Sequence, residues 1–326
     1  MGSRWLGEGG RGHLMELIRS DLNIDFLKRK ALFMSLSGLL ILVGIISLVI
    51  KGGPDFGIDF AGGLLLELRT QRPASTGEVR QAMADKGFGS AVVQNAWELG
   101  KASGQDFLVR MDLGEGKPEE MSRAVQDALE ERFGKGGLEI RRVEMVGPKV
   151  GKELQRKGTW AVVLALVAIL VYLAWRFEFK YSLGAVVALF HDVLITLGAF
   201  SVTGREIDLP IVAAFLTIVG YSVNDTIVIF DRVRENLRKY RRMPLAEVMN
   251  RSVNETLSRT ILTAGTVFVT DLALFLFGGG VIHDFAFALL VGIIAGTYST
   301  VFIASPIALM WEQRFGTRRA LAGRVG

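Results

Sequence analysis

PIVAAFLTIVGYSVNDTIVIF, residues 210–230, is an apolar stretch long enough to cross a lipid bilayer, and it contains the aspartate Asp225. About 20 helical residues span the hydrocarbon core of a bilayer. A carboxylate there costs roughly 2.5–3.5 kcal/mol on insertion scales, so it usually faces a bundle interior or a wet cavity and is a functional candidate. Thr217, Tyr221 and Asp225 are spaced four residues apart, with Asn224 beside them, and place a polar stripe on this helix. A buried polar contact between helices is the simpler explanation.

Five further apolar segments of comparable length occur in a chain of 326 residues that is 50% apolar. They lie at about 31–50, 158–175, 182–203, 257–277 and 282–311. The sequence therefore predicts a polytopic α-helical membrane protein with six transmembrane helices. The first span ends in LVIKGGPDF rather than at a small-residue cleavage site, so no secretory signal is predicted. We set residues 1–14 aside as a candidate non-native segment, because their composition differs and Met15 offers an alternative start.

Basic residues give the expected orientation. They gather in residues 1–30, in the 231–256 loop between the fourth and fifth spans, and in the 312–326 tail, whereas the short loops opposite contain only Arg205. The positive-inside rule then places both termini and the 231–256 loop in the cytoplasm of a multi-pass protein of the cytoplasmic membrane.

The composition also excludes several classes of site. The net charge of +5 follows from these basic loops, and no nucleic-acid recognition motif accompanies them, so we expect no nucleic-acid partner but contact with the lipid bilayer. The chain has no cysteine, which rules out disulfides and thiolate metal sites. Its three histidines are far apart in sequence and show no metal-ligand spacing. We therefore expect neither a metal nor a cofactor.

Residues 51–157 separate the first two spans and are expected outside the cytoplasm. Strands are indicated at 63–70, 90–97, 106–113 and 138–147, and helices at 76–87, opened by Thr76, and 117–134. The order βαββαβ predicts a small α+β domain of ferredoxin-like type. The glycines of FGIDFAGG do not lead from a strand into a helix, which argues against a phosphate-binding loop.

Two other spans carry ionisable residues. Arg259 begins a polar face of the fifth span that continues through Thr263, Thr266 and Thr270, with Asp271 adjacent. Asp225 and Arg259 lie near the same membrane surface, so an ion pair forms if the two polar faces meet. Alternatively, Arg259 only extends to the lipid headgroups.

The third span contains a further pair, His191 and Asp192, near its centre. This pair is either a relay or a satisfied hydrogen-bonded contact between helices. Gly292 and Gly296, followed by Ser299, indicate close helix packing without chemistry.

At these residues the chain resembles the SecF family of protein-export membrane subunits. The resemblance extends from about residue 20 to residue 312 and rests on five motifs that occur in the family's order. These are GIDFAGG (57–63), VGPKVGKEL (146–154), FHDV (190–193), VGYSVNDTIVIFDRVREN (219–236) and NETLSRT (254–260). Ala61 departs from the family's frequent threonine.

The resemblance implies more than the spacing does. It implies one six-helix half of the resistance-nodulation-division architecture, with SecD as the other half, in the bacterial inner membrane. It implies work beside the SecYEG channel, where protons moving down the proton-motive force help to draw an exported preprotein outward, and it implies no enzymatic activity. The family's proton-coupling acid and arginine correspond to Asp225 and Arg259. The possible relay or helix-interface residues are His191, Asp192, Asn224, Tyr221, Thr263 and Asp271.

Two other functions remain open. A stand-alone exporter of small molecules or lipids would use the same membrane acids, but with one half's helices it would have to dimerise. A non-transporting assembly subunit would tolerate the loss of Asp225 and Arg259 as long as its complex formed.

Overall fold

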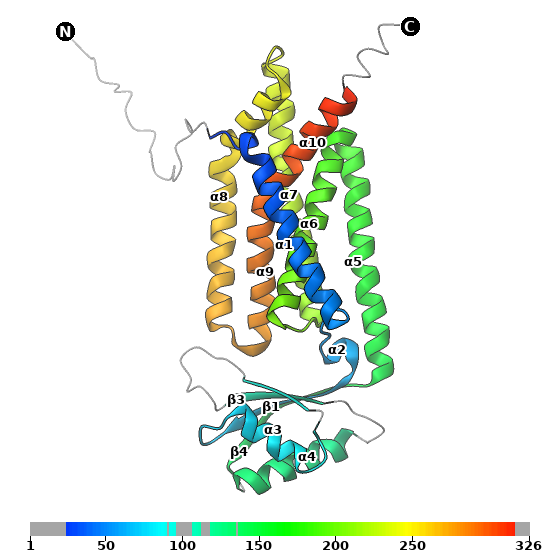
Figure 1. Ribbon diagram of the computed structural model, residues 1–326, viewed down its shortest axis with the longest axis vertical. Coiled ribbons are helices and arrows are strands. Elements are labelled where there is room, and N and C mark those ends of the chain that lie inside the picture. Colours follow the sequence, from blue (N-terminus) through cyan, green and yellow to red (C-terminus); the bar gives the residue numbers. More distant parts are fainter. Residues whose placement is uncertain (1–23, 90, 96–105, 112–117, 135, 317–326) are drawn as a thin grey trace, which may run out of the picture.

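The computed structural model describes residues 24–89, 91–95, 106–111, 118–134 and 136–316, and consists of a long helical bundle with a small α/β unit at one end (Figure 1). Six helices of this described part are long and apolar enough to cross a membrane, which confirms the expected number. They comprise α1 (Lys30–Lys51), α5 (Pro148–Arg176), α6 (Phe179–Thr203), α7 (Leu209–Lys239), α8 (Leu245–Phe277) and α9 (Gly279–Ser299). The last continues through a π-helical turn, Thr300–Ala304, into α10 (Ser305–Trp311) and a second π-helical turn, Glu312–Gly316.

Helices α6, α7 and α9 form the centre of the bundle and bury much more of their surface than α1, α5 and α8. Helix α1 crosses α6 so closely that a Cβ atom on Gly44 would lie 2.7 Å from Gly198 Cα. The expected packing role of Gly292 and Gly296 is also observed, since Gly292 abuts Ile218 and Gly296 abuts Ser222, both on α7.

The α/β unit has the expected element order. It consists of β1 (Gly63–Thr70), α3 (Thr76–Ala84), β2 (Val92–Asn95), β3 (Asp106–Met111), α4 (Pro118–Phe133) and β4 (Leu138–Val146). The sheet order is β2-β3-β1-β4 with all neighbours antiparallel, which confirms the ferredoxin-like arrangement. Alternate residues of β1, Leu64, Leu66 and Leu68, are fully buried in a core that includes side chains of α3 and α4.

Several boundaries differ from the sequence-based expectation. The N-cap of α3 is Ser75, whose hydroxyl accepts a hydrogen bond from Glu78 N in a capping box, so Thr76 is the first helical residue rather than the cap. Helix α5 starts at Pro148 instead of residue 158, because PKVGKEL is polar and hydropathy does not detect it. Most of the 231–256 loop is helical, since α7 continues to Lys239 and α8 starts at Leu245.

The GIDFAGG motif joins the two parts of the molecule. It contains an unexpected short helix, α2 (Ile58–Ala61), which packs against the start of α5 (Figure 1). Gly151 of α5 permits this approach, since a Cβ atom there would lie 2.9 Å from the carbonyl oxygen of Phe60. The motif is therefore a structural junction.

Candidate functional site

Asp225 lies half-buried on α7 and faces α8. Its Oδ1 accepts a hydrogen bond of 2.8 Å from Thr260 Oγ1, and its Oδ2 is buried without a hydrogen-bond partner among the described residues. A buried carboxylate oxygen that no donor satisfies is costly, so such a group in a native protein calls for an explanation, of which a functional role is one. The geometry therefore supports the selection of Asp225 as the first candidate.

Arg259 does not form the ion pair with Asp225 that their similar depth in the membrane allowed. Its side chain is exposed, and Thr260, the next residue, donates to Asp225 instead. Successive helical residues point about 100° apart, so the rotation of α8 that directs Thr260 toward α7 directs Arg259 away. Arg259 is nevertheless the residue next to the donor of Asp225 in the chain.

Tyr221 and Asp271 extend the same interface along the helices. Tyr221 is half-buried, contacts Thr263, and is influenced electrostatically by both Asp225 and Asp271. Asp271 is 4% exposed and its Oδ2, like that of Asp225, has no hydrogen-bond partner in the described chain. Two incompletely satisfied carboxyl groups thus lie along α7 and α8.

The other polar residues that the sequence singled out on these two helices have exposed side chains. Asn224, Arg259, Thr263, Thr266 and Thr270 are exposed, as is Thr217. The threonine hydroxyls donate to backbone carbonyls of their own helices, for example Thr263 Oγ1 to Arg259 O at 2.9 Å. This surface, which we call the α7–α8 polar face, lies at the periphery of the bundle.

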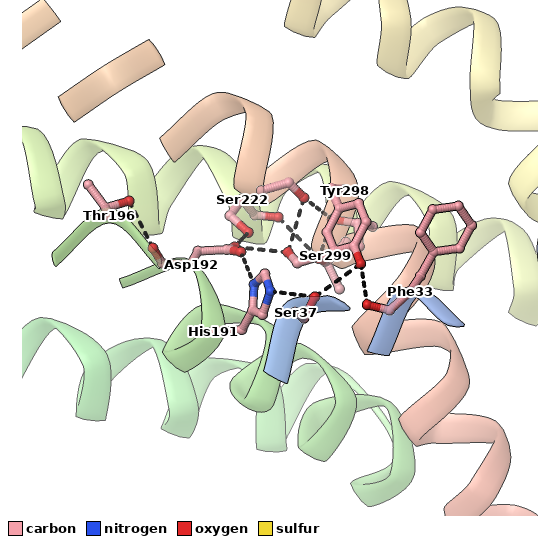
Figure 2. A network of polar contacts seen from close by, with 11 residues as sticks. Phe33, Ser37, His191, Asp192, Thr196, Ser222, Tyr298 and Ser299 are labelled. Carbon is pink, nitrogen blue, oxygen red and sulfur yellow. Dashed lines mark hydrogen bonds and ion pairs between the residues drawn. The ribbon is translucent and has the colours of Figure 1, made fainter. Parts of the chain in front are cut away.

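His191 and Asp192 lie in a separate polar network at the centre of the bundle (Figure 2). His191 Nδ1 is 2.9 Å from Asp192 Oδ1, and His191 Nε2 is 3.0 Å from Ser37 Oγ of α1. Asp192 Oδ2 accepts hydrogen bonds from Ser222 of α7 at 2.5 Å and from Ser299 of α9 at 2.9 Å. The pair therefore joins four helices, of which the sequence identified only α6.

The partners of this pair come from distant parts of the chain. Ser37 also donates to the hydroxyl of Tyr298, 261 residues away, and Tyr298 donates to the carbonyl oxygen of Phe33. Ser37, Ser222 and Tyr298 were not expected in this network, and Ser299 was expected only to pack between helices. Likewise, Thr260 was not expected as the donor to Asp225. These serine, threonine and tyrosine residues could have been recognised by one sequence feature, since each is a polar residue within an apolar span.

A third group of charges lies in a cleft of about 420 Å³ between the sheet and the loop from α6 to α7. Arg205 forms an ion pair with Asp284, and Arg110 of β3 pairs with Glu206 at 2.5 Å. Burial raises the pKa of Glu206, with Arg110 opposing it, and burial together with Asp59 and Asp284 raises the pKa of Asp208 to about 6. In the described chain, no group of three or more potential metal ligands occurs.

Comparison with known proteins agrees with this architecture. Residues 125–314 match the family model "Protein export membrane protein SecD/SecF, C-terminal", and residues 46–74 match "SecD/SecF GG Motif". The chain is 42% identical to the protein translocase subunit SecF of Calditerrivibrio nitroreducens, over 91% of this chain and 96% of that protein. The chain belongs to the SecF family.

Other relatives support the assignment. SecF of Magnetococcus marinus is 44% identical, over 95% of this chain and 98% of that protein. The crystal structure of SecDF, a translocon-associated membrane protein from Thermus thermophilus, superposes with a TM-score of 0.78 at 35% identity. That match covers 90% of this chain but 39% of the SecDF chain. The chain is thus a multi-pass membrane subunit of a protein translocase, not an enzyme, and it corresponds to one part of a SecDF.

Proposed function

We propose that this chain acts with SecD beside the SecYEG channel of the bacterial inner membrane, and that it uses the proton-motive force to promote preprotein export. Asp225 and Arg259 are its proton-coupling residues. The observation that carries the proposal is the half-buried carboxylate of Asp225, which has one donor, Thr260, one oxygen without a partner, and a guanidinium nearby.

The chemistry follows from this asymmetry. In the ionised state, the unsatisfied Oδ2 of Asp225 attracts the cation of Arg259 toward the interface between α7 and α8. In the protonated state the attraction disappears and Arg259 is free to leave. Moving one charge through the membrane field supplies about 2.3 kcal/mol per 100 mV, enough to bias two arrangements of the helices. Tyr221, Thr263 and Asp271 lie along the same interface and are proposed to extend the proton route.

The α7–α8 polar face supports SecD as the partner. An exposed arginine on the periphery of a membrane bundle is unfavourable against lipid hydrocarbon, so a second protein is the better neighbour of this face. The match covers 39% of the Thermus SecDF chain, so the rest of that chain is long enough to contain a second protein half that corresponds to SecD.

The topology of the molecule supports the expected orientation. The start of α1 and α10 lie at the end of the bundle opposite the sheet (Figure 1). With the basic loops in the cytoplasm, both termini are proposed to be cytoplasmic and the sheet domain extracytoplasmic.

Export of a model preprotein into inverted vesicles tests the proposal. Asp225→Asn should remove the stimulation that depends on the proton gradient while leaving the gradient-independent component and SecD association unchanged. Thr159→Ala is the control, because Thr159 is exposed on α5, outside the α7–α8 polar face, and donates to a backbone carbonyl of its own helix. Full gradient-dependent stimulation by Asp225→Asn would contradict the proposed coupling.

An assembly subunit without a coupling role is the second candidate, favoured by the same exposed polar face. It predicts that Asp225→Asn and Arg259→Ala both retain full stimulation whenever SecD co-purifies with the chain.

A further inference from the structure

In the chain of hydrogen bonds that joins His191 to Phe33, the donor and the acceptor of each bond can be assigned, starting from the Phe33 carbonyl (Figure 2). The Phe33 carbonyl can only accept, so Tyr298 supplies the hydrogen of their 2.5 Å contact. Tyr298 has no second hydrogen, so Ser37 supplies the hydrogen of the 3.0 Å contact between their hydroxyls. Ser37 has then used its own hydrogen, and the 3.0 Å contact with His191 needs a hydrogen on Nε2.

This direction determines how many protons the histidine–aspartate pair holds. With Nε2 protonated, a neutral imidazole would present a lone pair from Nδ1 to Asp192 Oδ1 at 2.9 Å. Two acceptors at that distance repel unless a hydrogen lies between them. The pair therefore carries one additional proton, either on Nδ1 or on Oδ1. In both cases the net charge of the pair is zero.

The surroundings favour a neutral pair. His191 is 6% exposed and Asp192 is fully buried. The groups that contact them from the neighbouring helices are the hydroxyls of Ser37 on α1, Ser222 on α7 and Ser299 on α9. Tyr298, stacked on the imidazole, is the other titratable group at this place, and no lysine or arginine of the described chain pairs with Asp192. A net negative charge here would have no counter-ion.

We propose that His191 and Asp192 form a second proton-binding site of the chain, distinct from Asp225, and that its proton holds α1 against α9. If the shared proton leaves to a water molecule, His191 must move its remaining hydrogen to Nδ1 to stay bonded to the carboxylate. Nε2 then becomes an acceptor and takes the hydrogen of Ser37, so the bond from Ser37 to Tyr298 is lost.

The consequence reaches beyond the network. Helix α1 leads into the GIDFAGG junction and the sheet domain, so a weaker contact between α1 and α9 loosens one of the two membrane helices that hold this domain. Helix α7 connects the two proton sites, since Ser222 contacts Asp192 and Asp225 lies three residues further along. A rotation of α7 caused by protonation of Asp225 would therefore change the hydrogen bond from Ser222 to Asp192.

Nitrogen NMR of the histidine rings in the full chain, bound to SecD in lipid nanodiscs, tests the proposal without measuring export. The chain has three histidines, so comparison with His191→Gln identifies the His191 signals. At about pH 7 we expect Nε2 of His191 to be protonated. Nδ1 is then either protonated as well or hydrogen-bonded to a protonated Asp192 carboxyl. In the second case, the infrared band of that carboxyl should disappear in Asp192→Asn. A neutral ring with Nε2 unprotonated would overturn the proposal.

Two variants separate the proton site from simple packing. Ser37→Ala removes the acceptor of the Nε2 hydrogen, so the Nε2 signal should shift. Thr196→Ala removes a hydroxyl that donates only to the Asp192 backbone carbonyl, so both ring signals should be unchanged. Equal shifts in the two variants would contradict the directed chain. Since neither readout depends on Asp225, failure of the coupling proposal at Asp225 would leave this result standing.

Discussion

At the scale of single residues, the chain places its carboxyl groups in three different environments. Asp192 has hydroxyl donors on one oxygen and a histidine on the other, Asp225 has one hydroxyl donor, and Asp271 retains an oxygen without any partner. Hydroxyl groups satisfy a buried carboxyl without adding charge, and they leave its protonation reversible in a way that a buried lysine or arginine would not. The three acids thus differ in how completely their carboxyl oxygens are satisfied by hydrogen-bond donors.

Asp208, outside the membrane spans, gives a pH-dependent prediction. It caps α7 by accepting a hydrogen bond from Ile211 N at 3.1 Å, and its pKa is raised from 3.8 to about 6, mainly by burial. Between about pH 4 and pH 6 the folded chain binds more protons here than the unfolded chain, so the stability contributed by Asp208 falls as pH rises through this window. The loss is at most about 3 kcal/mol.

Asp208→Asn should flatten this part of the pH profile, since asparagine keeps the cap without titrating. Thermal unfolding in detergent from about pH 4 to pH 7 measures the effect, with Asp85→Asn at an exposed position of the sheet domain as control. An unchanged slope in Asp208→Asn would disprove the assignment.

At the scale of helices and strands, the sequence predicted most of the architecture, because hydropathy and alternation are local properties. The strand 63–70 and the six spans follow directly from them. The polar start of α5 was not predicted because hydropathy does not detect it, and α2 was not predicted because it packs on Gly151, about ninety residues away in the chain. Thr260 rather than Arg259 contacts Asp225 because of the rotation of α8 about its axis. That rotation cannot be derived from the depth of the residues in the membrane.

The crossing of α1 and α6 yields a prediction at this scale. Gly44→Ala would place a Cβ atom 2.7 Å from Gly198 Cα, so the helices must separate, at a cost of roughly 1–3 kcal/mol. Separation would also stretch the 2.8 Å hydrogen bond between Ser47 and Ser201. Gly38→Ala on the same helix has no atom within 4 Å of the new Cβ and should be neutral or about 1 kcal/mol stabilising. Thermal unfolding in lipid compares them, and equal midpoints would contradict the close-contact argument.

At the scale of the whole molecule, a small set of contacts ties the sheet domain to the end of the bundle that faces it (Figure 1). The segment after α1 pairs with the loop between α6 and α7, through Ile207 N to Asp55 O at 2.7 Å and Gly57 N to Ile207 O at 2.8 Å. Arg110 of β3 reaches the same place, donating to Phe56 O at 3.0 Å and pairing with Glu206 at 2.5 Å. Movement of α6 or α7 would therefore reach the sheet through this corner.

The Arg110–Glu206 pair allows this transmission to be tested. Both side chains are 26% exposed, so the pair is better shielded than a surface ion pair, and reversing one charge should weaken domain docking. Spin labels can be attached through Asp85→Cys and Val202→Cys, since the chain has no other cysteine. The distance distribution between the labels should broaden in Arg110→Glu and in Glu206→Arg. The double reversal should restore a narrow distribution, with a coupling free energy of about 0.5–3 kcal/mol. If the single variants match the unreversed chain, the ion pair does not hold the domain, and its docking on the bundle would depend on the backbone hydrogen bonds.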